Sequence, residues 1–225
     1  MSMMLAPPSQ DVKPTEPVEA AKAEPPMQER SAPVEVERIG PTPFRWTPAE
    51  YNRAAEAGFF NDQRVELIRG RILYMSPIGP DHTVASTKAR YRLGDHFKEQ
   101  DGFIIGTQIP LRLEDSEPEP DLFVFRGTVD DEAGGDNEVV LVLEAAKSSL
   151  TFDRGTKLSL YAENGYLDYW ILNLVDNVLE VYRNPIQSNG TWTYADKTTI
   201  SVDGTISPLA KPEAVIRVAD LLPRQ

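Results

Sequence analysis

A run of five aliphatic residues at positions 139–143 (VVLVL) constrains the fold of this chain more than any other segment. Its length, and the turn signals on either side, are typical of a central β-strand with both faces covered by other elements. The run ends directly on Glu144. A carboxylate at the edge of an apolar sheet must be paired, hydrogen-bonded or bound to a metal ion, because its transfer out of water is otherwise costly. Glu144 is therefore the first candidate functional residue.

The length of 225 residues allows one domain of ordinary size with an additional tail. Residues 1–40 contain seven prolines and no aromatic residue. Such a composition buries too little apolar surface to offset the entropy of the chain. We expect a disordered, proline-rich, acidic extension over residues 1–40, inert rather than used for docking, and a single domain over residues 41–225.

The formal net charge is −12, of which residues 1–40 contribute −3 and the remainder −9. A negative field repels phosphate backbones unless bound cations or a local basic patch reverse it, which argues against unaided binding of nucleic acid. The chain has no cysteine, so neither disulfides nor thiolate metal ligands are available. No stretch has the roughly 20 apolar residues of a membrane span, and the first residues do not resemble a secretory signal. These features predict a cytoplasmic protein without a membrane partner.

Local patterns predict a series of strands and helices after residue 44. The segment 47–50 (TPAE) combines a capping box with proline at the first helical position, and predicts a short helix that stops at Gly58. The remaining predicted elements follow in this order: strands 65–68 and 71–75 joined across Arg69-Gly70, a helix from His82 to about residue 98, strands 103–108, 122–125 and 139–143, a helix from about residue 152 to 163, strands 168–174 and 178–182, peripheral strands near 192–194 and 215–218, and a short helix 219–222. The fold class is therefore α/β (α+β), with a mixed central sheet flanked by helices and extra C-terminal strands.

Asp121 and Glu144 stand at the ends of two predicted strands, and Lys157 lies in the helix that follows. Two carboxylates and a lysine can hold a Mg²⁺ or Mn²⁺ ion and stabilise the charge that develops during phosphodiester hydrolysis. Oxygen ligands without cysteine favour Mg²⁺ or Mn²⁺ over Zn²⁺.

Several motifs stand in a fixed order between residues 42 and 222. They are RVELIRG (64–70), MSPIGPDH (75–82), EPDL (119–122), LE (143–144), SSL (148–150), DRGTKL (153–158) and GYLDYWI (165–171). Together they resemble the Uma-two-type putative restriction endonuclease family, within the PD-(D/E)xK nuclease-like superfamily. The resemblance implies a restriction-endonuclease-like mixed sheet flanked by helices and metal-dependent cleavage of DNA. It also implies that Asp121 and Glu144 are the motif acids that bind the metal ion.

The position of the site lysine departs from the superfamily pattern. The expected position, two residues after the acid, holds Ala146, and Lys147 would point to the opposite face of the strand. The family places a lysine in the following helix, which corresponds to Lys157. We favour Lys157 over Lys147.

Each of these residues also has a structural interpretation. Asp121 follows a proline, a common turn pair. Glu144 can form an ion pair with Lys147 or Lys157. Lys157 lies four residues after Asp153, where a helix-surface pair contributes only about 0.3–0.5 kcal/mol. The joint occurrence of the motifs in order favours the functional interpretation.

Glu66 and His82 are the further candidate site residues. Glu66 alternates with apolar residues, so a solvent-facing strand position is as consistent with the pattern as a third metal carboxylate. His82 is a candidate base or substrate contact, but histidines in such places more often cap a helix or lie in a loop.

The sequence thus predicts a divalent-metal-dependent endonuclease acting on DNA, in which Lys157 orients water or stabilises charge and Glu66 and His82 assist. The alternative is a non-catalytic binding or interaction protein on a nuclease-like scaffold. Hydrolysis of another phosphoester is a third hypothesis. A homodimer is expected only by analogy with nucleases that cut both strands.

Overall fold

The computed structural model describes residues 40–131 and 137–224. The extension predicted over residues 1–40 lies outside the described residues except for Gly40.

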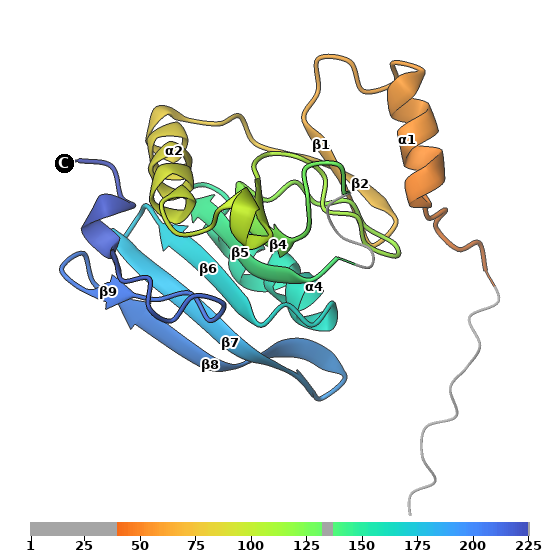
Figure 1. The fold of residues 1–225 in the computed structure, drawn as a ribbon. Helices are drawn as coiled ribbons and strands as arrows, with labels where there is room; N and C mark the ends of the chain where they lie inside the picture. Colours follow the sequence, from red (N-terminus) through yellow and green to blue (C-terminus); the bar gives the residue numbers. More distant parts are fainter. Residues whose placement is uncertain (1–39, 132–136, 225) are drawn as a thin grey trace, which may run out of the picture. The chain divides into compact units, whose positions relative to one another are not determined.

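A six-stranded sheet forms the centre of the fold, with the strand order β3-β4-β5-β6-β7-β8 (Figure 1). Its strands are β3 (Phe103–Gly106), β4 (Leu122–Arg126), β5 (Val139–Ala146), β6 (Asp168–Asn173), β7 (Val178–Ser188) and β8 (Thr191–Ile200). Neighbouring strands are antiparallel except for the parallel pair β5 and β6. The predicted mixed sheet is confirmed.

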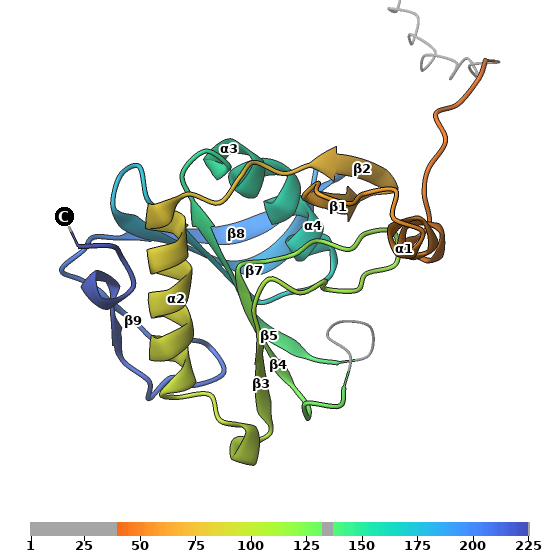
Figure 2. The same cartoon turned by 90° about the horizontal axis from the view of Figure 1, so that it is seen from above.

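Helices cover both faces of this sheet (Figure 2). The helix α2 (Pro80–Gly94) and the C-terminal segment pack on one face, and α4 (Leu158–Glu163) packs on the other. Successive side chains of β5 point to opposite faces. Leu143 and Ala145 therefore lie in the α2 core, while Val142 and Ala146 lie in the α4 core. Glu144 shares the α4 face, which places its carboxylate under that helix.

The connection from β5 to β6 is helical, as parallel strands require, but it is not the continuous helix that was predicted. It consists of α3 (Leu150–Phe152), a π-helical turn (Asp153–Lys157) and α4. At the end of the turn the Leu158 N–H donates to the Asp153 carbonyl, a wider spacing than in an α-helix. π-helical turns inside helices are frequent at functional sites.

A separate hairpin of β1 (Val65–Ile68) and β2 (Arg71–Tyr74) follows α1 (Pro48–Glu56). The predicted capping box at Thr47 is confirmed. The turn residues Arg69 and Gly70 have φ of 50° and 71°, as a two-residue hairpin turn requires. A Cβ at position 70 would also lie 2.8 Å from Arg45 Cβ, so both the positive φ and the lack of space favour glycine there.

Several predicted boundaries were wrong. The helix α2 begins at Pro80 rather than His82, because proline is pre-organised for the first helical position. β7 and β8 are far longer than predicted and turn at Asn189-Gly190, both with positive φ. The C-terminal elements are β9 (Thr205–Ile206), β10 (Ile216–Arg217) and the 3₁₀ turn Val218–Asp220 in place of the predicted helix 219–222, and a further 3₁₀ turn, Glu99–Asp101, precedes β3.

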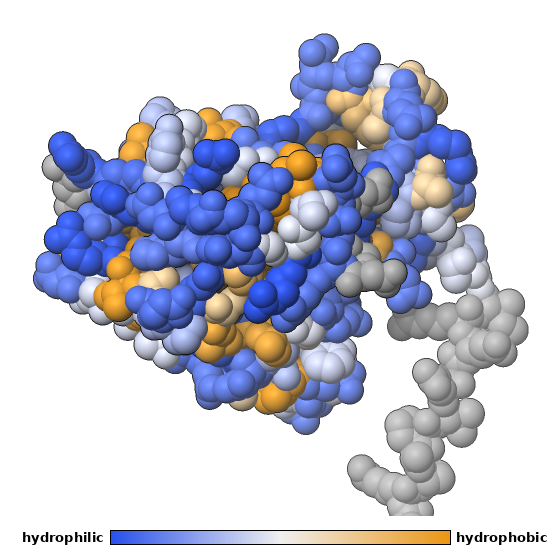
Figure 3. All heavy atoms as spheres, viewed as in Figure 1, coloured by the Kyte–Doolittle hydropathy of each residue, from blue (hydrophilic) through white to orange (hydrophobic). Residues whose placement is uncertain are grey.

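The face of the molecule in Figure 3 is mostly hydrophilic, with small hydrophobic areas between the charged side chains. Within the described part of the chain, no helix combines the length and the apolar character that a bilayer crossing needs.

Candidate active site

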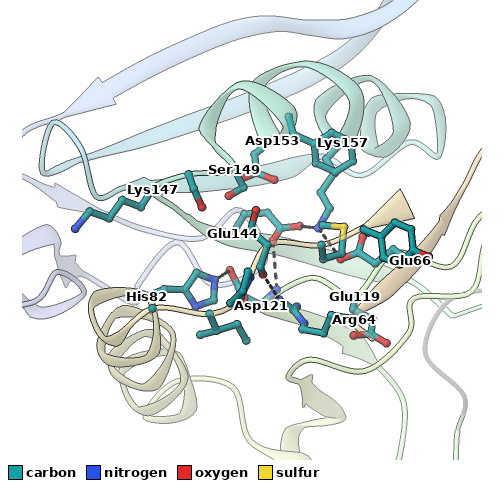
Figure 4. Close-up of a pocket in the computed structure, with 18 of the residues that line it drawn as sticks. Arg64, Glu66, His82, Glu119, Asp121, Glu144, Lys147, Ser149, Asp153 and Lys157 are labelled. Atoms are coloured by element: carbon teal, nitrogen blue, oxygen red, sulfur yellow. Dashed lines mark hydrogen bonds and ion pairs between the residues drawn. The ribbon is translucent and has the colours of Figure 1, made fainter. Parts of the chain in front are cut away.

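A cavity of about 660 Å³ opens between the β1–β2 hairpin, the start of α2, the ends of β4 and β5, and the π-helical turn. Figure 4 shows the charged side chains that converge on it from these elements. All five predicted site residues line the cavity: Glu66, His82, Asp121, Glu144 and Lys157.

Asp121 and Glu144 are interlocked across adjacent strands. The Asp121 Oδ2 atom accepts a hydrogen bond of 2.7 Å from the backbone N–H of Ala145. The backbone N–H of Asp121 in turn donates to Glu144 Oε2 at 3.4 Å. Because β4 and β5 pair in register beside these residues, the sheet fixes the two carboxylates next to each other.

Lys157 joins two carboxylates at the centre of the cavity. Its Nζ atom lies 2.9 Å from Glu144 Oε1 and 3.3 Å from Glu66 Oε1. The Tyr161 hydroxyl donates a further bond of 2.8 Å to Glu144 Oε1. All of these side chains are buried; Glu66, Lys157 and Glu144 are 1%, 3% and 4% exposed.

The π-helical turn places Asp153 and Lys157 in the interior together. The interpretation of these residues as an ordinary helix-surface pair was therefore wrong, because both are buried. Lys157 lies one helical turn before Tyr161, so both contact Glu144 from the same side.

Several acids surround the single cation at the centre of the cavity, and the pKa values of three of these acids are raised. Burial raises the pKa of Glu66 to about 7, against the opposing charge of Lys157. Burial, together with the charge of Glu144, raises the pKa of Asp153 to about 7. Burial also raises the pKa of Glu144. Glu66 Oε2 and Asp153 Oδ2 are buried without a hydrogen-bond partner, so this cluster is not internally satisfied.

Lys157 remains a cation in this setting. Burial alone would lower its pKa, but the charges of Glu144, Glu66 and Asp153 outweigh burial and raise the pKa above its ordinary value. The lysine therefore offers a permanent positive charge inside the cavity at neutral pH.

His82 lies in the first turn of α2 and its imidazole contacts Asp121, with Nε2 2.8 Å from Oδ2. Burial lowers the pKa of His82, but the hydrogen bond and charge of Asp121 outweigh it, so the pKa is raised. The side chain does not cap the helix, because the N-cap residue is Gly79. Its Nδ1 atom is buried without a partner.

Two sequence interpretations change with these contacts. Glu66 does not face solvent, because the β1 strand is buried on both of its faces. Lys147 does not contact Glu144; it extends away from that carboxylate, as Figure 4 shows, and its Nζ lies 2.7 Å from Asp81 Oδ2.

The sequence reasoning missed further residues of the cavity. Asp153 and Glu119 line it, and each belongs to a motif quoted above, so their place in those motifs was the available signal. Burial raises the pKa of Glu119 as well. Arg64 also lines the cavity and opens the motif RVELIRG (64–70), so it had the same signal. Tyr161, which donates a hydrogen bond to Glu144 but does not line the cavity, had no distinguishing sequence signal.

The donor atoms of the cavity are chemically compatible with the predicted Mg²⁺ or Mn²⁺ ion. Two carboxylates from adjacent strands, supplemented by water, suit a hard divalent cation. The buried oxygen atoms of Glu66 and Asp153 that have no hydrogen-bond partner show that the cavity has more acidic oxygen atoms than donors to pair with them. Within residues 40–131 and 137–224, however, no group of three or more His, Cys, Asp or Glu side chains is arranged to hold a metal ion.

Comparisons with known proteins agree with this architecture. Residues 48–217 match the family model described as "Uma2: Putative restriction endonuclease". Among solved structures, the chain is similar to a putative nuclease belonging to DUF820 from Anabaena variabilis, with a TM-score of 0.60 and 16% sequence identity over 78% of this chain and 96% of that one. That identity supports likeness of fold alone. No curated protein matches the chain.

Proposed function

Because the chain belongs to the Uma2 family of putative restriction endonucleases, we propose that it is a divalent-metal-dependent endonuclease that hydrolyses phosphodiester bonds in DNA. The observation that carries the proposal is the buried cluster of Glu66, Asp121, Glu144 and Asp153 around Lys157 in one cavity. Such an excess of buried acid is costly to folding and is typical of a site that binds a cation.

In this proposal Asp121 and Glu144 hold the metal ion. When bound, Mg²⁺ or Mn²⁺ would polarise a phosphate oxygen and activate the attacking water. The sheet pre-organises the two ligands, because the Ala145 and Asp121 N–H groups hold them in place. Pre-organised ligands require no rearrangement when charge develops.

Lys157 stabilises the negative charge that develops on the phosphate. Its raised pKa keeps the ammonium charged, and its low exposure removes competing water. Glu66, with a pKa of about 7, can accept a proton from the attacking water near neutral pH. His82 orients Asp121 through the Nε2 to Oδ2 contact of 2.8 Å.

Plasmid cleavage tests this function directly. Purified protein with Mg²⁺ or Mn²⁺ should nick supercoiled DNA, and EDTA should abolish the nicking. Glu144→Gln keeps the shape of the side chain and removes its charge, so it should reduce nicking at least about 100-fold. Equal nicking by the folded variant would show that the activity comes from elsewhere.

The second candidate is a non-catalytic binding protein on the same scaffold. The observation that favours it is the absence, within the described residues, of a three-ligand metal group. Under this alternative, calorimetry detects no divalent-ion binding at millimolar concentration. A homodimer, which would let such a nuclease cut both strands, is tested by light scattering of the purified protein.

A further inference from the structure

The reacting groups of the proposed nuclease lie deep inside the molecule. Asp121, Glu144 and Lys157 are at most 5% exposed, and Glu66 is 1% exposed. The cavity above them, about 660 Å³, is within the range of about 300–1,000 Å³ that is usual for sites enclosing one small molecule. A phosphate must enter this cavity to reach the proposed metal ligands.

The lining of the cavity includes apolar and aromatic side chains. Tyr74 lines the cavity at the end of β2 and is 76% exposed, and Ile78 in the following loop is 36% exposed. Phe152 lines the cavity from α3. An exposed aromatic ring beside a phosphate-hydrolysing site is a suitable surface for a nucleobase, because every base has a face that can stack.

Among the residues that the structure describes, the lining of the cavity has no excess of the basic side chains with which proteins usually bind the backbone of a duplex. Apart from His82, its charged lining residues are six acids and three bases: Glu66, Asp81, Glu119, Asp121, Glu144 and Asp153 against Arg64, Lys147 and Lys157. Lys147 pairs with Asp81, and Lys157 pairs with Glu66 and Glu144. Duplex DNA carries one negative charge per about 1.7 Å of its axis, but the charged lining residues that are not buried offer it no excess of positive charge, because Arg64 and Lys147 are balanced by Asp81 and Glu119.

On the basis of the function proposed above, we propose that the substrate is DNA with unpaired nucleotides, either single-stranded or carrying a single-stranded flap. One nucleotide enters the cavity, its base lies against the apolar surface of Tyr74, Ile78 and Phe152, and its phosphate reaches Asp121, Glu144 and Lys157. An unpaired nucleotide can be turned out of line with its neighbours at little cost, whereas a paired one must first be unstacked.

The test compares three forms of one labelled oligonucleotide at equal concentration in Mg²⁺ or Mn²⁺: single-stranded, annealed as a blunt duplex, and annealed with a single-stranded flap. The proposal expects cleavage of the single strand and of the flap at least ten times faster than of the blunt duplex, with cuts in the unpaired part. Equal rates, or a preference for the blunt duplex, would overturn it while leaving the nuclease function intact. No cleavage of any form would overturn the nuclease function itself.

Variants of Tyr74 test the stacking surface. Loss of a stacked base costs about 1–3 kcal/mol, so Tyr74→Ala should raise KM for the single strand about 5- to 150-fold with little change in kcat. Tyr74→Phe, which keeps the ring, should restore the KM. Tyr91→Ala is the matched control, because Tyr91 lies on α2, is 68% exposed and does not line the cavity. An unchanged KM in Tyr74→Ala, or an equal rise in Tyr91→Ala, would contradict the stacking role.

Discussion

Two buried carboxylates lie on the same face of the central sheet, Glu144 on β5 and Glu180 on β7, and they are compensated in opposite ways. Glu180 is 1% exposed, yet it contacts two cations, Arg154 and Lys197, and accepts hydrogen bonds from the Tyr182 hydroxyl at 2.6 Å and from the Asn173 amide at 2.9 Å. Although burial opposes ionisation, the hydrogen bonds from Arg154 and then from Tyr182, Asn173 and Lys197 lower the pKa of Glu180 to about 2.

The Glu144 cluster has the reverse balance. Glu66, Glu144 and Asp153 surround one ammonium group, that of Lys157, and burial raises the pKa of all three acids. The same π-helical turn supplies a cation to each cluster, Arg154 to Glu180 and Lys157 to Glu144. The contacts of the Glu180 cluster compensate its charge within the fold, whereas the Glu144 cluster has more acids than cations, as the proposed metal site requires.

The largest expected effect is a difference in DNA cleavage between variants of the two cations of the π-helical turn, Lys157 and Arg154. Lys157→Met should reduce DNA cleavage about 100-fold or more, because it removes the charge that stabilises the phosphate. Arg154→Met should retain most of the cleavage and lower the stability instead, since it leaves Glu180 with one cation. Lys147→Met, at an exposed pair with Asp81, should change cleavage less than about fivefold. Rates are measured on variants whose circular dichroism matches the wild type.

A loss of activity in Arg154→Met equal to that in Lys157→Met would remove the proposed distinction between the clusters. A large loss in Lys147→Met with full activity in Lys157→Met would instead assign the site lysine to position 147.

Neutral replacements of the acids should change stability in opposite directions. Glu180→Gln should lower the free energy of unfolding by about 1–3 kcal/mol, because it removes the acceptor of two cations. Glu66→Gln should raise it by about 1–3 kcal/mol at pH 8, because it removes a buried charge whose pKa is raised. Urea denaturation of both variants at pH 8 measures this. Destabilisation by Glu66→Gln as large as that by Glu180→Gln would show that both clusters are structural.

The two clusters also predict opposite slopes of stability with pH. The pKa of Glu66 rises from 4.5 to about 7 on folding, so the folded state binds the extra proton and stability increases as pH falls from about 7 to 4.5. The pKa of Glu180 falls from 4.5 to about 2, so its contribution is present above pH 4.5 and is lost as pH falls toward 2. Stability should therefore be greatest near pH 5. Urea titrations from pH 3 to 8 test this, and Glu66→Gln should flatten the slope above pH 5.

The sequence predicted the centre of the fold well because its signals were local and strong. The aliphatic run before Glu144 is typical of an interior strand, and the capping box and the Arg69-Gly70 turn specified their elements directly. The ordered motifs contain all five candidate residues, and the structure places all five in the lining of one cavity.

The features that were missed depend on tertiary context. The π-helical turn adds one residue to a helical turn without changing the helical character of the sequence, so nothing local revealed that Asp153 and Lys157 are buried. The alternation around Glu66 could not distinguish a solvent-facing strand from one covered on both sides. The strands β7 and β8 were predicted too short because Pro185 interrupts the strand pattern and their distal halves are largely exposed.

Calorimetric titration with Mn²⁺ at pH 7.5 tests the central claim most directly, because it needs neither the right DNA substrate nor turnover. The account predicts saturable binding to the wild type and to Glu180→Gln, and loss of that binding in Glu144→Gln. No binding to the wild type, or undiminished binding to folded Glu144→Gln, would contradict the claim that the undercompensated acids around Lys157 are a metal site.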